Sequence, residues 1–422
     1  MDRLFVDGGA RLAGTVRISG AKNSALKLMA ASLLAPGVSS LRNVPRIQDC
    51  FTMAEVLEHL GARVSWEDGG VSVDATTLSS VEAPYELVRR MRASIAVLGP
   101  LLARTGEAKV AMPGGDNIGS RPIDLHLDGL RRMGATIDAE HGFLVARAEG
   151  LVGASITLDY PSVGATENLL MAAVTADGIT VIDNAAREPE IADLAEFLAA
   201  MGAGIHGAGA ATLEIEGVGA LAPAGHAAIP DRIEAGTWAA AAVATRGEVT
   251  LEGARPEHLE LFLEKLAEGG AEIRMTDAGL RVRQPDRARA ADFVTLPYPG
   301  IATDFQPIML AMLATASGTS IATENVFEGR FMYVDELRRM GADIRTEGHH
   351  AVIRGVERLS AAPVRALDIR AGAAMAIAAL TADGTSEIAD IEHVDRGYEG
   401  FEAKLSALGA TVRRDPELVR LP

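Results

Sequence analysis

Four basic side chains occupy positions that ordinary helix chemistry does not favour. Each lies at or next to the start of a segment with an apolar, helical pattern: Lys22, Arg92, Arg232 and Arg370. Neighbouring Ser, Thr, Asn or Asp residues can cap the free backbone N–H groups, but the helix macrodipole opposes a cation at this end. An anion placed among the cations and the helix ends removes the conflict. We therefore predict that several helix ends of this chain face a ligand that carries phosphate.

The helices that carry these cations belong to an internal repeat of about seventy residues. A Gly-Ala pair that ends a helix recurs at Gly61, Gly134, Gly202, Gly270, Gly341 and Gly409. A second glycine, which closes an apolar helix before β-branched residues, recurs at Gly37, Gly106, Gly178, Gly247, Gly318 and Gly384. Glycine is favoured after a helix because it adopts the left-handed conformation at little cost. Two markers with one period predict six α/β repeats.

Each repeat is expected to contain two helices of different character. The first is apolar nearly all round and should be buried, as in residues 25–34, 169–175, 238–244, 308–315 and 375–380. The second has a charged face and should lie outside, as in residues 53–60, 124–133 and 334–340. Six repeats could close as one ring, as in DNA sliding clamps, or form two domains of three around a cleft. Clamps line their hole with basic helices, whereas the helices here mix both signs, so we favour two domains.

Composition restricts the functional classes. The 422 residues carry a net charge of −17, which argues against a nucleic-acid binder, because phosphate neutralisation requires clustered Lys and Arg. No apolar run approaches the roughly 18 residues that span a bilayer, and the N-terminus lacks a signal-peptide pattern. We expect a cytoplasmic protein without a membrane partner, and a monomer.

The sequence also lacks the usual signatures of bound cofactors. Cys50 is the one cysteine, and the nine histidines show no ligand spacing, which argues against a metal site. No Walker-type loop or Rossmann fingerprint occurs in a convincing context. We predict neither a metal nor an organic cofactor.

Several motifs in order resemble the enolpyruvyl transferase family over essentially the whole chain. They are Gly-Ala-Lys22-Asn23-Ser24, residues 113–126, 161–166, 184–190, 230–234, 303–304, 323–330, 368–370 and 395–398. The resemblance implies a two-domain inside-out α/β barrel with three repeats per domain. It places the first domain at 22–229, with a catalytic loop at about 112–122. The second domain combines 1–21 with 230–422, and the active site lies in the interdomain cleft.

The motifs look most like the branch of the family that acts on UDP-N-acetylglucosamine in peptidoglycan synthesis. The implied reaction joins the enolpyruvyl group of phosphoenolpyruvate to the 3-hydroxyl of this sugar nucleotide, through a tetrahedral ketal that then loses phosphate. Such chemistry needs an anion cradle, a base near the hydroxyl and an acid for the methylene carbon. Two alternatives remain: another acceptor, such as a nucleotide or shikimate 3-phosphate, and a noncatalytic repeat protein that binds an anion.

The resemblance also assigns residues. It gives phosphoenolpyruvate the cations Lys22, Arg92, Arg121, Arg330, Arg370 and Arg396. It gives the UDP-sugar Asn23, Arg92, Arg121, Pro122, Ile123, Asp124, Leu125, Val163, Gly164, Asp304 and Val326. The catalytic set is Asp116, Asp304, Lys22 and Arg396. Asp304 is the expected base for the hydroxyl, and its other possible role is to cap the helix that follows it.

Asp116 departs from the family pattern. Most members have a cysteine at this loop position, and the antibiotic fosfomycin alkylates that thiol. A carboxylic acid can deliver the same proton, but its ordinary pKa of about 3.9 requires burial to keep it protonated at neutral pH. We predict that Asp116 is the general acid and that the protein is insensitive to fosfomycin. Gln48 is a second departure, because some members have a basic residue there.

Overall fold

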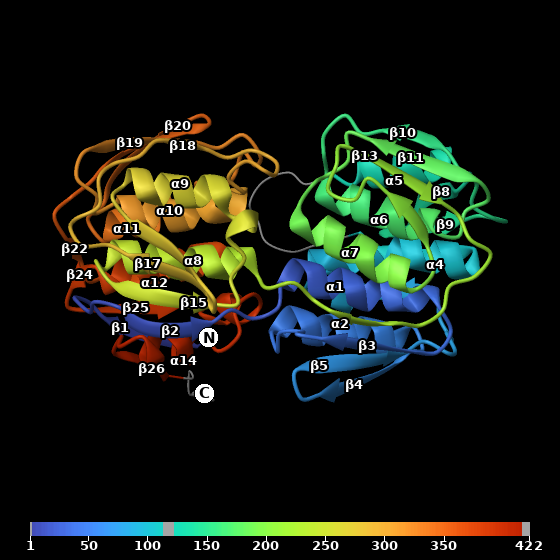
Figure 1. Ribbon diagram of the computed structural model, residues 1–422, viewed down its shortest axis with the longest axis horizontal. Helices are drawn as coiled ribbons and strands as arrows, with labels where there is room; N and C mark the ends of the chain where they lie inside the picture. The colour runs from blue at the N-terminus through green and yellow to red at the C-terminus, as the bar shows by residue number, and fades with distance from the viewer. Residues whose placement is uncertain (1, 113–121, 416–422) are drawn as a thin grey trace. The chain divides into compact units, whose positions relative to one another are not determined.

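The computed structural model describes residues 2–112 and 122–415. These residues form two compact units (Figure 1). Unit 1 contains residues 2–19 and 230–415, and unit 2 contains residues 20–112 and 122–229. The chain therefore begins in unit 1, passes through unit 2, and returns to unit 1 after Ile229.

Unit 2 contains three four-stranded sheets, one for each predicted repeat. In every sheet an outer strand runs parallel to its neighbour, and the remaining pairs are antiparallel. The strand orders are β14(Gly225–Ala227)-β3(Val38–Arg42)-β5(Gly70–Asp74)-β4(Arg63–Glu67), then β6(Glu82–Ala83)-β7(Glu107–Ala111)-β9(Phe143–Arg147)-β8(Thr136–Glu140), and β10(Ser155–Thr157)-β11(Ile179–Asp183)-β13(Thr212–Glu216)-β12(Gly204–His206).

Unit 1 repeats this pattern and uses the N-terminus to complete it. Its four-stranded sheets are β16(Glu272–Thr276)-β17(Gly279–Arg283)-β15(Glu248–Glu252)-β2(Ala13–Arg17), then β18(Phe293–Val294)-β19(Thr319–Thr323)-β21(His350–Arg354)-β20(Asp343–Glu347), and β23(Pro363–Arg365)-β25(Thr385–Ala389)-β1(Arg3–Asp7)-β26(Val412–Asp415). In Figure 1 the blue strand β1 lies among the red strands of the last repeat, and it pairs antiparallel with both β25 and β26. The first strand of the chain is thus an inner strand of the last repeat.

The predicted α/β fold of six repeats is confirmed, with three repeats in each unit. A two-stranded sheet of β22(Leu359–Ser360) and β24(Ala382–Asp383) adds to unit 1. The strands of the described residues form separate sheets rather than one closed barrel.

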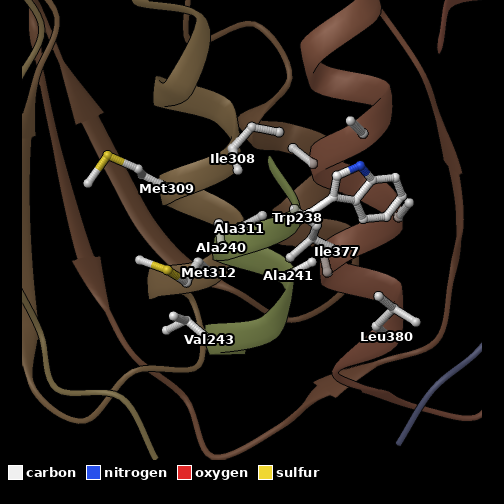
Figure 2. Close-up of a cluster of buried hydrophobic side chains, with 14 of the residues drawn as sticks. Trp238, Ala240, Ala241, Val243, Ile308, Met309, Ala311, Met312, Ile377 and Leu380 are labelled. Atoms are coloured by element: carbon white, nitrogen blue, oxygen red, sulfur yellow. The ribbon is translucent and has the colours of Figure 1, made fainter. Parts of the chain in front are cut away.

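The first helix of each repeat is buried, as its apolar pattern predicts. These helices are α1(Lys22–Ala31), α4(Leu98–Thr105) and α6(Val163–Ala173) in unit 2, and α8(Arg232–Ala244), α10(Gln306–Leu313) and α12(Ile369–Leu380) in unit 1. Figure 2 shows Trp238 of α8, Ile308 of α10 and Ile377 of α12 in one core. The six alanines of α8 and the six of α12 present little bulk, which allows close packing of these helices. Helices are therefore the interior of each unit.

The second helices carry most of their charged residues on their exposed side. They are α2(Gln48–His59), α5(Asp124–Arg132), α7(Pro189–Ala200), α9(Glu260–Glu268), α11(Val334–Arg339) and α14(Phe401–Ala407). In the three segments predicted to be amphipathic, Glu55, Arg131 and Arg338 are exposed. The hydrophobic periodicity thus separates the buried helices from the outer ones.

Eleven of the twelve repeat-marker glycines have a positive φ, as expected of residues that end a helix in the left-handed conformation. Gly247 is the exception, and for this position the prediction is wrong. A Cβ atom there would lie 2.2 Å from the carbonyl oxygen of Leu12, in the loop before β2. A close backbone approach, and not the left-handed conformation, requires glycine at this position.

The N-terminal strand should contribute strongly to the stability of unit 1. Leu4 on β1 is 1% exposed, so Leu4→Ala leaves a cavity and should lower the free energy of unfolding by about 2 to 5 kcal/mol. Val38 on β3 is 56% exposed, and Val38→Ala should change the free energy of unfolding by less than about 0.5 kcal/mol. Urea unfolding of both variants measures the difference. Equal effects would show that β1 is dispensable.

Candidate active site

Asp304 lies between two buried arginines in unit 1. It is in the short 3-10 helix η4(Thr303–Phe305), which leads into α10. Its Oδ1 lies 3.3 Å from Arg330 Nη2 and its Oδ2 lies 3.0 Å from Arg370 Nε. The side chains of Arg330 and Arg370 are only 2% and 5% exposed, while that of Asp304 is 27% exposed. The structure thus brings three predicted site residues from three segments into contact.

Asp304 does not cap the helix that follows it. Asp231 and Asp368 do cap the equivalent helices: their carboxylates accept backbone N–H groups in the first turns of α8 and α12. No side-chain cap bond is made at the start of η4 or of α10. The N-cap positions of η4 and α10 belong to Ala302 and Phe305, so Asp304 occupies neither of them. The carboxylate is instead directed to the guanidinium groups.

The two arginines retain unused donors. Arg330 Nε and Arg370 Nη1 are buried and have no hydrogen-bond partner among the residues that the structure describes. Buried polar groups are nearly always paired, so such donors indicate a missing acceptor. Guanidinium groups form their strongest hydrogen bonds with carboxylate and phosphate oxygens. The arrangement is therefore suited to bind an anion beside Asp304.

Tyr398 supports Arg370 from the other side. The guanidinium carbon lies 5.1 Å from the centre of the Tyr398 ring, and the Tyr398 hydroxyl is 2.9 Å from Thr237 Oγ1. Burial disfavours the charge of Arg370, but Tyr398, Asp304 and Asp231 together outweigh burial and hold its pKa above the ordinary value. Arg370 therefore stays charged in this buried position.

Arg396 follows α13(Glu392–Asp395), and the chain after it lies against α12. A Cβ atom on Gly397 would come within 2.5 Å of Ile369 Cγ2 and 3.6 Å of Arg370 Nη1. The close approach at Gly397 requires the absence of a side chain. It places the backbone that follows Arg396 beside the unused donor of Arg370.

Glu324 is a residue that our sequence reasoning missed. It follows β19, is 1% exposed, and accepts the backbone N–H groups of Val326 and Phe327 at 2.8 and 3.0 Å. Its other oxygen accepts a hydrogen bond from the hydroxyl of Thr303 at 2.9 Å. The charge of Glu324 inside the run 323–330 was the one available signal. Glu324 therefore connects Val326, a predicted contact of the UDP-sugar, to Thr303, the residue before Asp304.

In unit 2, Lys22 is the first residue of α1 and forms an ion pair with Asp49. The distance between Lys22 Nζ and Asp49 Oδ2 is 2.8 Å, and both residues are buried. Asp49 is in the first turn of α2, next to Gln48, and sequence reasoning missed it because an acidic residue there is ordinary helix chemistry. This carboxylate compensates a cation at the positive end of a buried helix. Asn23, the next residue of α1, is partly buried.

A buried histidine joins the helix starts of unit 2. Arg92 begins the 3-10 helix η2(Arg92–Val97), and together with Lys27 it acts on His126 of α5. Burial first, and then the charges of Arg92 and Lys27, lower the pKa of His126 from 6.5 to about 4. His126 Nδ1 lies 2.9 Å from Asn168 Nδ2, an amide nitrogen that can only donate. The imidazole is therefore neutral, with its proton on Nε2.

His126 also brings two predicted nucleotide segments together. Pro122 and Ile123 precede α5, which begins with Asp124 and Leu125. Val163 and Gly164 begin α6, and a Cβ atom on Gly164 would come within 3.2 Å of His126 Nε2. The two segments therefore meet at His126.

Lys27 forms the second buried ion pair of α1, 3.1 Å from Glu167 of α6. Burial raises the pKa of Glu167 to about 7, with the Lys27 charge opposing and Glu190 and Glu188 adding to the rise. The predicted residues Asp116 and Arg121 lie outside the described residues.

One group of side chains among the described residues has the spacing of metal ligands: Asp193, Glu196 and His226. Asp193 already lies 2.7 Å from His226 Nε2 and accepts hydrogen bonds from Ser24 and from the backbone of Ile229. These bonds compensate its burial, and we assign no ion to it. No helix in the described ranges is long and apolar enough to cross a membrane.

Comparison with known proteins identifies the family. The family model described as EPSP synthase (3-phosphoshikimate 1-carboxyvinyltransferase) matches residues 6–405. The chain belongs to the EPSP synthase family of enolpyruvyl transferases. The UDP-N-acetylglucosamine 1-carboxyvinyltransferase of Corynebacterium jeikeium (strain K411) is 55% identical over 98% of this chain and 99% of its own length. The protein of that name from Nocardia farcinica (strain IFM 10152) is 54% identical over 98% of each chain.

Solved structures agree with this membership. The enolpyruvyl transferase NikO from Streptomyces tendae has a TM-score of 0.87, with 27% identity over 98% of this chain and 99% of its own. An EPSP synthase from Acinetobacter baumannii has a TM-score of 0.76 at 18% identity, over 99% of this chain and 100% of its own, which shows a shared fold. The family predicted from the motifs is confirmed. The residue roles remain predictions.

The neutral state of His126 has a consequence for stability. The unfolded chain binds a proton on this ring below about pH 6.5 and the folded chain only below about pH 4, so its contribution to stability falls as the pH falls through this range. His126→Gln keeps an acceptor for Asn168 but does not titrate. The difference in unfolding free energy between wild type and this variant should therefore shrink by about 2 kcal/mol between pH 7 and pH 5.

Urea unfolding at both pH values measures this difference. Glu167 has the opposite pH dependence, because its pKa is raised, but it is present in both proteins and cancels in the comparison. His59 is exposed on α2, and His59→Gln should leave the difference unchanged. Parallel pH profiles for wild type and His126→Gln would contradict a neutral buried imidazole.

Proposed function

We propose that this protein transfers the enolpyruvyl group of phosphoenolpyruvate to the 3-hydroxyl of UDP-N-acetylglucosamine and releases phosphate, a step of peptidoglycan synthesis. One observation carries the proposal: Asp304 is held by two buried arginines that keep N–H donors for an anion. Relatives with 52 to 55% identity over 98% of the chain bear the name UDP-N-acetylglucosamine 1-carboxyvinyltransferase, which supports this acceptor.

The cations hold the donor substrate. Phosphoenolpyruvate carries a phosphate and a carboxylate, and the open donors of Arg330 and Arg370 are suited to oxygens of either group. Lys22, Arg92, Arg121 and Arg396 supply further positive charge. Because the arginines of unit 1 are already fixed by Asp304 and Tyr398, they lose little conformational entropy when the anion binds.

Asp304 is the base that takes the proton of the sugar hydroxyl. Its carboxylate accepts hydrogen bonds from two guanidinium groups, and such bonds favour the charged form of a carboxylate and make it a weaker base. A bound anion shares the guanidinium groups with Asp304 and weakens their hold on it. The base is therefore activated when the donor substrate is present, which suits a reaction that joins two substrates.

Asp116 supplies the proton that the methylene carbon of phosphoenolpyruvate receives. The addition forms a ketal with a new methyl group, and loss of phosphate together with one proton of that methyl group yields the enolpyruvyl ether. The sugar nucleotide is held by Asn23, by the segment from Pro122 to Leu125, and by Val163, Gly164 and Val326. No cofactor or metal takes part in the proposed reaction.

Release of inorganic phosphate tests both the acceptor and the base. Wild type should release phosphate with phosphoenolpyruvate and UDP-N-acetylglucosamine, and not with shikimate 3-phosphate or UMP. Asp304→Asn keeps the size of the side chain but removes the base, so kcat should fall by about 10² to 10⁴. Asp292 is an exposed carboxylate of unit 1 that accepts a backbone N–H, and Asp292→Asn should leave kcat unchanged.

Other outcomes of this assay would indicate a different function. Turnover with UMP or shikimate 3-phosphate would indicate a different acceptor within the same family. Binding of phosphoenolpyruvate without turnover of any acceptor would favour a noncatalytic binder. Full activity of Asp304→Asn would exclude this residue as the base.

Asp116 predicts the response to fosfomycin. Asp116→Asn removes the proton donor and should abolish turnover with UDP-N-acetylglucosamine. Wild type should keep its activity after incubation with excess fosfomycin, because a carboxylate at this position replaces the reactive thiol. Cys50, the one cysteine of the chain, is buried, so Cys50→Ser should behave as wild type in both assays. Irreversible inactivation by fosfomycin would overturn the assignment of Asp116.

A further inference from the structure

We infer that Glu324 is a positioning residue that couples the base Asp304 to the segment that holds the sugar nucleotide. The inference rests on the proposed function, because it takes the roles of Asp304 and Val326 from there. Glu324 is buried and uses both carboxylate oxygens. One oxygen accepts the N–H groups of Val326 and Phe327, and the other accepts the hydroxyl of Thr303.

The segment after β19 is held by bonds that do not involve this carboxylate. The backbone N–H of Glu324 donates to the carbonyl of His349 at 2.8 Å, and that of Asn325 donates to Thr295 Oγ1 at 3.0 Å. Side-chain acceptance of the N–H groups two and three residues ahead is an ordinary local cap. The bond to Thr303, in a segment 21 residues earlier, is not local. This second bond is what calls for a functional explanation.

Thr303 and Phe305 determine where Asp304 lies. Phe305 is buried and stacks on Phe262 with ring centres 4.3 Å apart, which anchors one side of η4. The bond between Thr303 and Glu324 anchors the other side. Because Asp304 must reach Arg330 and Arg370 at once, a small displacement of Thr303 moves the carboxylate away from one of them. Catalytic groups misplaced by about 1 Å can lose up to 10²-fold in rate.

The two sets of hydrogen bonds made by Glu324 can be tested separately. Thr303→Val is nearly isosteric and removes the hydroxyl, so it removes the hydrogen bond between Glu324 and Thr303 and leaves the bonds to Val326 and Phe327. Thr303→Ser keeps the hydroxyl. Glu324→Gln removes the negative charge that strengthens both sets of bonds.

Steady-state kinetics and calorimetric binding of UDP-N-acetylglucosamine test the inference. We expect Thr303→Val to lower kcat roughly tenfold while the Kd of UDP-N-acetylglucosamine stays within twofold, and Thr303→Ser to restore kcat. Glu324→Gln should both lower kcat and raise the Kd about fivefold. In the double variant the losses in kcat should not multiply, because both changes act on the same hydrogen bond.

Glu336 is the matched control. It is a buried glutamate of unit 1 that accepts a backbone N–H, from Arg365 at 3.1 Å. Glu336→Gln should lower the melting temperature and leave kcat and Kd unchanged. If Thr303→Val and Glu324→Gln also lower only the melting temperature, as expected of Glu336→Gln, Glu324 is only a local cap. The same conclusion follows if their effects on kcat multiply. Should Glu324→Gln fail to fold, the comparison of Thr303→Val with Thr303→Ser decides. Failure of wild type to bind the nucleotide or release phosphate would instead refute the proposed function.

Discussion

The ion pairs of Asp304 with Arg330 and Arg370 are the constraint on which the site of unit 1 depends. Both guanidinium groups are almost wholly buried, and taking a charge out of water costs several kcal/mol unless a partner compensates it. One carboxylate cannot satisfy all their donors, so two buried guanidinium nitrogens remain without a partner in the described part of the chain. An anionic ligand completes a hydrogen-bond arrangement that these residues leave incomplete.

The repeat explains how a framework residue became available for chemistry. Asp231 and Asp368 precede α8 and α12 and cap them, whereas Asp304, near the start of α10, pairs with two arginines. Other groups hold the framework together away from the helix starts. Arg287 donates to four backbone carbonyls that follow α10 and β21. Arg104 also donates to backbone carbonyls, those of Leu33 and Ala75, which follow α1 and β5. The helix starts can therefore carry polar groups that do not serve stability.

Unit 2 treats its buried charges differently. Lys22 is paired with Asp49 and Lys27 with Glu167, while burial, and then the charges of Arg92 and Lys27, lower the pKa of His126 and keep it neutral. Each of these side chains stands on a helix or at its first turn, and rigid elements hold groups more precisely than loops do. Gly164, in the first turn of α6, lies against the ring of His126.

The repeat, the helical interior and the cations at the helix starts could be predicted from the sequence, because glycine spacing, hydrophobic period and helix ends are local properties of the chain. For Asp304 the sequence left open a role as base and a role as helix cap, and the structure shows which partners its carboxylate has. Arg370 is 66 residues away and reaches Asp304 because α10 packs on α12. Asp49 and Glu324 escaped notice for the same reason, since a carboxylate at a helix start or after a strand looks ordinary until its partner is known. Gly247 is a case in which the local pattern was misleading. Its sequence context matches that of the other repeat glycines, but glycine is required there because the carbonyl of Leu12, which is distant in the sequence, approaches closely. Which charges compensate one another is decided by packing between distant segments, and no local pattern encodes it.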